Sequence, residues 1–194
     1  PGFIFSTARK RILQAALQQE YVHIFEFISL ILQYSKTQEL DDSLVENCLH
    51  AFRSFCKSMP PGFIFSTEIV DHILTHLDSL HSIATLDCLL EIVELEKAGQ
   101  PGADEAQASL SSIASGKIVL IHAELLDFFT RYLSKFSEPE RLSSAYCRMA
   151  VQEQLFLKKC ALVFAAIYER WISALEDGST QKGLGCLVEI SKID

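Results

Sequence analysis

The sequence predicts an all-α protein made of stacked antiparallel helical hairpins, an α-solenoid of about seven helices. Three observations lead to this fold class. Apolar residues recur at helical spacing along almost all of the 194 residues, the alternating pattern of strands is nearly absent, and proline or glycine interrupts the helical pattern at intervals. A closed bundle also fits these features. Several expected helices are apolar on more than one face, which favours the open stack, because an inner hairpin needs neighbours on both sides.

The apolar pattern of the N-terminal half predicts four helices, over residues 8–34, 42–57, 67–77 and 81–97. The first is apolar nearly all round, so it must be covered on several sides. The second has an apolar stripe that includes Val45, Leu49 and Phe52 at helical spacing. The sequence Pro60-Pro61-Gly62 separates the second helix from the third, because proline and glycine interrupt regular structure.

A change in composition follows the fourth helix. Residues 98–116 are rich in alanine, serine and glycine, so we expect a loop or insertion there, holding at most one short helix near 106–114. Further helices are expected over residues 118–136, 143–175 and 180–193, the last weakened by two glycines. Residues 1–194 are therefore expected to form a single α-solenoid segment.

The heptapeptide Pro-Gly-Phe-Ile-Phe-Ser-Thr occurs twice, at Pro1–Thr7 and at Pro61–Thr67. The second copy precedes Glu68 and Asp71, whose negative charges suit the start of a helix, so we interpret it as a turn that opens a helix. The first copy precedes Ala8-Arg9-Lys10-Arg11, whose three cations oppose the same dipole. We therefore expect residues 1–7 to pack poorly, and we do not interpret the two copies as a structural repeat.

Composition limits the classes of function. The net charge is −8, from 17 basic and 25 acidic residues, which argues against direct binding of nucleic acid. The longest unbroken apolar run, Cys160–Tyr168, is far shorter than a membrane span, so we expect no membrane association. Six cysteines without a C-x-x-C motif indicate small buried side chains in a reducing compartment. The chain is thus expected to be soluble and intracellular.

The sequence contains few residues in patterns typical of catalytic or metal-binding sites. His72 and His76 would lie on one helix face at a spacing that can bind zinc, but only Asp71 or His81 could add a third ligand. We therefore expect exposed helical histidines, and a small helical enzyme using them is the remaining catalytic hypothesis. No residues are assigned to catalysis, a cofactor or a metal, and we predict that the protein is not an enzyme and uses no cofactor.

Other polar groups have structural interpretations. Glu91, Glu94 and Glu96 are expected to form the solvated side of a helix, and Lys158-Lys159 is too small a basic cluster for nucleic acid. Trp171 is expected in the core rather than at a cofactor.

The stretch Asp42–Leu95 resembles the exportin-1 family of nuclear export receptors, within the importin-β-like superfamily. The resemblance rests on a helix ending in Cys48-Leu49-His50-Ala51-Phe52-Arg53-Ser54-Phe55, the turn Met59–Thr67, and a helix containing Leu86-Asp87-Cys88-Leu89-Leu90-Glu91-Ile92. The order and spacing of these segments agree with the family. Pro61 and Ser66 stand where the family usually has leucine and glutamate.

The resemblance implies HEAT repeats and a non-catalytic receptor segment from the N-terminal half of such a protein. Family members bind Ran in its GTP form together with cargo carrying a leucine-rich export signal, and they pass nuclear pore proteins as they shuttle between nucleus and cytoplasm. The cargo groove and its reactive cysteine lie outside this stretch, so no cysteine here inherits that role. The residues that would contact partners stay unknown. A generic HEAT-repeat scaffold, or another importin-β-like transport receptor, is the alternative hypothesis.

Overall fold

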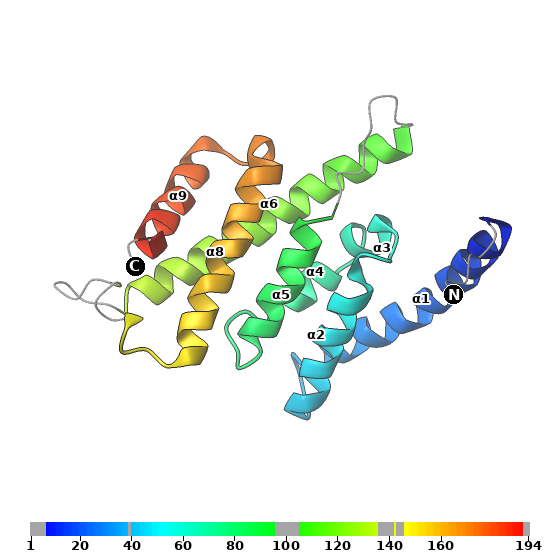
Figure 1. Cartoon of the computed structure of the whole chain (residues 1–194), viewed down its shortest axis with the longest axis horizontal. Coiled ribbons are helices and arrows are strands. Elements are labelled where there is room, and N and C mark those ends of the chain that lie inside the picture. Colours follow the sequence, from blue (N-terminus) through cyan, green and yellow to red (C-terminus); the bar gives the residue numbers. More distant parts are fainter. Residues whose placement is uncertain (1–6, 39, 96–104, 136–141, 143–145, 192–194) are drawn as a thin grey trace, which may run out of the picture.

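The computed structural model describes residues 7–38, 40–95, 105–135, 142 and 146–191. These residues form eight α-helices and one 3-10 turn, and no strand occurs among them. The helices pack in two layers (Figure 1): α2, α5 and α8 lie side by side in one, and α1, α4 and α6 pack behind them. The predicted all-α fold of stacked hairpins is confirmed.

The first hairpin consists of α1 (Thr7–Tyr34) and α2 (Asp42–Cys56). The side chain of Asp41 caps α2, accepting a hydrogen bond of 2.8 Å from the backbone N–H of Ser43. Hydrogen bonds from Ser43 lower the pKa of this carboxyl group. Val45, Leu49 and Phe52 are buried, as the apolar stripe of α2 predicts.

Two short helices, α3 (Pro61–Phe65) and α4 (Ile69–Leu74), lead into α5 (Ser82–Val93). The expectation of a plain turn at Pro61–Thr67 is wrong, because its first five residues form α3. Proline fits the first position of a helix, where its missing N–H is not needed, and burial of Ile64 and Phe65 stabilises this single turn.

The third hairpin consists of α6 (Glu105–Leu133) and α8 (Val151–Trp171), followed by the 3-10 turn η1 (Ile172–Ala174) and by α9 (Asp177–Ser191). The loop expected over 98–116 is wrong from Glu105 onward, since α6 runs through Gly116 without a break. Alanine is the best helix former, and Ala114 is buried in the core, so this segment continues the helix. Residues 98–104 lie outside the described part of the chain.

Two other boundaries differ from the expectation. The helix expected over 143–175 begins at Val151, where the carboxylate of Glu153 accepts a hydrogen bond of 3.1 Å from the N–H of Ala150. It ends at Trp171, and the next three residues tighten into η1. Residues 1–6 of the first heptapeptide copy lie outside the described residues, so the expectation of poor packing there stays a prediction.

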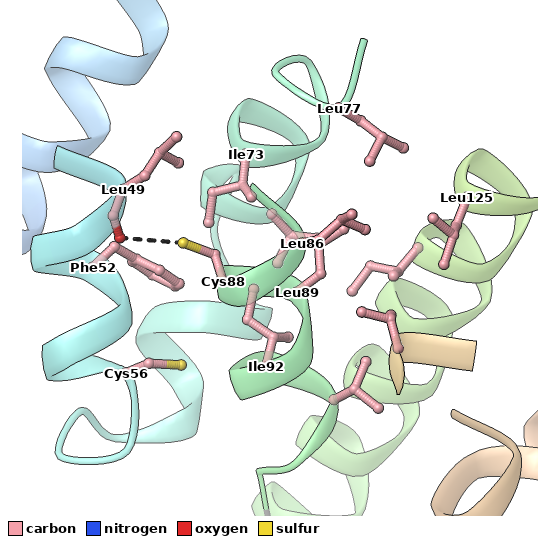
Figure 2. Close-up of a cluster of buried hydrophobic side chains, with 14 of the residues drawn as sticks. Leu49, Phe52, Cys56, Ile73, Leu77, Leu86, Cys88, Leu89, Ile92 and Leu125 are labelled. Carbon is pink, nitrogen blue, oxygen red and sulfur yellow. Dashed lines mark hydrogen bonds between the residues drawn. The ribbon is translucent and has the colours of Figure 1, made fainter. Parts of the chain in front are cut away.

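Helix α5 is the centre of the core. It contacts α2 on one side and α8 on the other, and most of its side chains are buried. Figure 2 shows Leu86, Leu89 and Ile92 among the buried side chains that pack around it, and the thiol of Cys88 donating to the backbone oxygen of Leu49 at 3.2 Å. A helix covered on both flanks is what an inner member of a stack requires.

One described stretch, Ala108–Leu133 of α6, is long and apolar enough by composition to cross a membrane, with a mean hydropathy of 1.2 in its most apolar window. Its Ile118, Leu125 and Phe129 are fully buried in the hydrophobic core. In all, 33% of that window is buried, so packing against neighbouring helices accounts for part of its apolar character.

Candidate protein-binding face

The outward side of α2, α5 and α8 carries charged groups of both signs. We call this side the α2–α5–α8 face. Its charges come from Arg53 and Lys57 on α2, from Asp87 and Glu91 on α5, and from Lys159 on α8. The three helices lie side by side (Figure 1), so charged side chains on neighbouring helices come close enough to form ion pairs.

Asp87 joins all three helices. One carboxylate oxygen accepts a hydrogen bond of 3.2 Å from Nη1 of Arg53 on α2, and the other accepts one from the ammonium group of Lys159 on α8. Asp87 is only 7% exposed, and buried carboxylates of this kind require partners. Asp87 therefore fixes the spacing of three consecutive helices of the layer.

Glu91 lies one turn further along α5. Its two oxygens pair with Nε of Arg53 at 3.5 Å and with Nζ of Lys57 at 2.7 Å. Lys57 also reaches Glu94 at 3.4 Å, and the hydrogen bond with Glu91 is the main cause that raises the pKa of Lys57. The expectation that these glutamates simply face solvent is wrong for Glu91 and Glu94, since they bind cations of the neighbouring helix. Glu96 lies outside the described residues.

The end of α8 is attached to the end of α5. The indole Nε1 of Trp171 donates to the backbone oxygen of Val93 at 2.9 Å, and Nη1 of Arg170 donates to that of Glu94 at 2.8 Å. These donors satisfy carbonyl groups that the helix end leaves without partners. Trp171 is 1% exposed, which confirms its predicted place in the core.

This face suits recognition of a protein surface. Its charges stand on rigid helices and are held in position by their ion pairs, and such preorganisation lowers the cost of binding. Arg53 and Lys57 keep exposed side chains, at 43% and 61%, so a partner can reach them. The described residues contain no group of three or more His, Cys, Asp or Glu side chains placed to hold a metal ion.

The structure places His72, His76 and His81 in one region, where α4 and the loop after it meet the end of α1. The expectation of exposed histidines is wrong: all three are less than 10% exposed. Nε2 of His76 lies 2.9 Å from the hydroxyl of Ser35, and its ring packs edge-on against that of His81. Burial lowers the pKa values of His72 and His76. These side chains fill the joint between two hairpins, because the short α4 faces α1.

All six cysteines are free thiols. The prediction of buried cysteines is confirmed for five of them, and burial raises the pKa of Cys56 to about 12. Cys147 is the exception: it lies exposed in the turn before α8.

Sequence reasoning missed Asp87 and Arg53 as organising residues. A signal was present, since Arg53 and Lys57 are four residues apart on α2, and Asp87 and Glu91 are four apart on α5. Opposite charges with the same helical spacing indicate facing ridges. The sequence does not reveal that α2 and α5 are neighbours, or that they pack with Arg53 beside Asp87 and Glu91.

The chain is similar to one protein family and to two curated proteins. Residues 5–89 match the family of exportin 1-like proteins, from α1 to most of α5. Protein EXPORTIN 1B of Arabidopsis thaliana is 27% identical over 188 residues, which cover 94% of this chain and 16% of that protein. Exportin-1 of Schizosaccharomyces pombe is 24% identical over 181 residues, covering 90% of this chain and 15% of that protein. The chain thus spans less than a fifth of the length of these curated relatives.

Proposed function

We propose that the chain, which is similar to exportin-1 proteins along most of its length, is a segment of that family and forms part of a nuclear export receptor. In this role it is a non-catalytic scaffold. The whole receptor would carry cargo with a leucine-rich export signal out of the nucleus together with Ran-GTP. It would bind nuclear pore proteins on the way and shuttle between nucleus and cytoplasm. Support comes from the family match to residues 5–89 and from similarity to exportin-1 proteins along most of the chain.

The proposed mechanism is binding linkage. If Ran-GTP and cargo each bind better to one curvature of the stack, each raises the affinity of the other. Stacked hairpins transmit such a change because each contacts only its neighbours, so small shifts between hairpins accumulate along the stack. The observation that best supports a part for this segment is the α2–α5–α8 face, whose ion pairs join consecutive hairpins and leave Arg53 and Lys57 accessible.

The experiment is a pull-down of the immobilised chain with Ran loaded with GTP or with GDP. We expect stronger binding of the GTP form, and a loss of at least about fivefold in affinity when Arg53 and Lys57 are both changed to Glu, as for charged interface residues. Arg131→Glu on α6, in the other layer, is the matched control and should leave binding unchanged. Equal binding of the two nucleotide forms, or none, would contradict the proposal.

The alternative is a generic HEAT-repeat scaffold, or another importin-β-like receptor with different partners. The stacked hairpins alone agree equally well with a generic scaffold, since fold does not determine partner. A scaffold of this kind would bind its partners regardless of the nucleotide on Ran, so the same pull-down distinguishes the two proposals.

A further inference from the structure

Two connecting loops meet at the edge of the molecule where α2 and α5 begin. The loop after α1 ends at Asp42, the first residue of α2, and the loop after α4 ends at His81, just before α5. Oδ1 of Asp42 lies 3.6 Å from Nε2 of His81, and at the far ends of the same two helices Lys57 reaches Glu94 at 3.4 Å. The helices therefore run parallel, side by side (Figure 1), and a change in spacing at one end alters the angle between them.

Histidine side chains fill the contact between the two loops. Nε2 of His76 lies 2.9 Å from the hydroxyl of Ser35, at the end of α1, and this hydroxyl donates to the backbone oxygen of Leu32 at 2.8 Å. A hydroxyl has a single proton, so it accepts from His76, whose neutral ring carries its proton on Nε2. The contact thus ties the end of α1 to the loop after α4.

The rings of this contact have no place for further protons. We call His72, His76 and His81 together the histidine joint. Nδ1 of His72 and Nδ1 of His81 are buried and have no hydrogen-bond partner among the described residues. A charged imidazole carries a proton on both nitrogens, so each of these atoms would become a buried donor without an acceptor. The rings of His76 and His81 are 5.9 Å apart, so charges on both would also repel each other.

The charges around the joint act mainly against its protonation. They come from every element packed around it: Lys36 after α1, Asp42 on α2, Glu68 and Asp71 at α4, and Lys117 on α6. Burial, His81, Lys36 and His72, in that order, lower the pKa of His76. Burial and then Lys36 lower the pKa of His72, while the two carboxylates at α4 raise it by less. The closed joint therefore holds these two imidazoles in the neutral form.

A hollow of about 560 Å³ lies beside the joint. Its lining comes from the two loops and the start of α2, and it includes Ser35, Lys36, Asp42, His76, Leu80 and His81. A water molecule occupies about 30 Å³ in the liquid, so the hollow has room for many. Water can thus reach the rings when the two loops move apart, and the apolar core between the helices need not open.

We propose that the histidine joint is a pH-sensitive hinge between the α1–α2 hairpin and α5. With neutral rings, the contact of His76 with the end of α1 holds the two loops together. When the rings take up protons, the loops separate and the charged imidazoles turn toward the water of the hollow. The far ends of α2 and α5 stay joined, because the ion pairs of Lys57 with Glu91 and Glu94 contain no histidine. The angle between consecutive hairpins changes as a result. This inference does not depend on the proposed role in nuclear export.

The direction of the response follows from linkage. The closed joint binds protons more weakly than an open one, in which the rings regain their ordinary pKa of about 6.5. A fall in pH below this value therefore favours the open form. Between pH 7.5 and pH 5.5 the equilibrium constant for opening rises by up to about tenfold for each imidazole that takes up a proton.

The test measures distances between pairs of spin labels by electron paramagnetic resonance. One pair is placed at Gln38→Cys and Leu80→Cys, exposed positions in the two loops, in a chain that carries Cys147→Ser to remove the exposed native thiol. We expect a longer distance to become more populated from pH 7.5 to pH 5.5, while circular dichroism shows unchanged helix content. A control pair at Ser54→Cys on α2 and Leu162→Cys on α8 should keep its distance, because it lies away from the joint.

Substitutions identify the groups responsible. His72→Gln combined with His76→Gln should keep the short distance at pH 5.5, because glutamine can donate a hydrogen bond and does not take up a proton. Lys36→Gln, at an exposed position where the fold should persist, should open less at pH 5.5, because it removes a cation that disfavours protonation of the closed joint. His23→Gln, at an exposed position on α1, is the matched control and should open as the unchanged protein does.

Three outcomes would overturn the proposal. The first is a loop-to-loop distance that stays the same at both pH values in the folded protein. The second is full opening in the His72→Gln, His76→Gln double variant. The third is an equal change in the control pair, since the whole layer would then loosen rather than the joint.

Discussion

Asp87 is the residue whose position is hardest to explain without its partners. A carboxylate that is 7% exposed costs several kcal/mol unless it is paired, and Asp87 is paired on both oxygens, with Arg53 and with Lys159. Both partners belong to other helices, so the group links α5 to α2 and α8. The charge is tolerated in α5 because its neighbours on both sides supply cations.

We predict that Asp87→Ala lowers the free energy of unfolding by about 2 kcal/mol. The change leaves two cations without their carboxylate, and the expected loss is below that of a fully buried pair because water reaches Arg53. Urea unfolding followed by the fluorescence of Trp171, the single tryptophan, measures the loss. Asp78→Ala is the matched control: its pair with Arg131 is exposed and should contribute less than about 1 kcal/mol. Equal effects of the two variants would contradict this account of Asp87.

At the scale of elements, α9 is held by a close approach at Gly183. A Cβ atom added there would lie 1.7 Å from the hydroxyl oxygen of Tyr168 and 3.0 Å from Nε2 of His122. These two groups share a hydrogen bond of 2.8 Å between α8 and α6. The glycine that weakens α9 as an isolated helix therefore allows it to pack on both neighbours.

We predict that Gly183→Ala destabilises the protein by about 2 kcal/mol, because the methyl group displaces Tyr168 and breaks its bond to His122. Gly185→Ala on the same helix has open space around its Cβ and should be neutral or stabilising by up to about 1 kcal/mol. Thermal unfolding of the two variants provides the comparison. Adding Tyr168→Phe to Gly183→Ala should recover part of the loss, and no recovery would mean that the hydroxyl is not the obstacle.

At the scale of the whole molecule, buried histidines make stability depend on pH. Burial is the main cause that lowers the pKa values of His72, His76 and His122, and Lys36 lowers the first two further. Glu68 and Asp71 act in the opposite direction on His72. The unfolded chain therefore binds more protons than the folded one, so stability rises with pH through this range.

We predict that stability is fully present above about pH 6.5, the ordinary value of histidine, and falls as the pH drops toward the lowered values of the folded state. The loss arises because imidazoles that are buried in the neutral form bind protons more weakly than they do in the unfolded chain. Urea unfolding at pH 7.5, 6.5 and 5 measures it. A double variant, His76→Gln with His122→Gln, should lose less stability between pH 7.5 and pH 5 than the unchanged protein. His50→Gln, at an exposed position, should lose as much as the unchanged protein. Stability that stays constant or rises toward pH 5 would contradict this prediction.

Much of the architecture was predictable because helical periodicity is local. The stripes of α2 and α5 follow from residues a few positions apart, and the structure confirms them. The break between α2 and the next helix ends at Pro60, because Pro61 and Gly62 already belong to α3. The errors arose where small residues made the pattern ambiguous. Residues 105–116 have a loop-like composition, yet Leu110 and Ala114 pack against the core and extend α6. Tertiary packing overrides weak local preference at such places.

The sequence by itself determined that the chain is all-α, which segments form its longer helices, and that it resembles exportin-1-like proteins. Only the tertiary structure decided that Asp87 links three helices and that His72, His76 and His81 are buried. The physical reason is that helices form from contacts three and four residues apart. Ion pairs, burial and surfaces, in contrast, depend on the register in which distant helices pack.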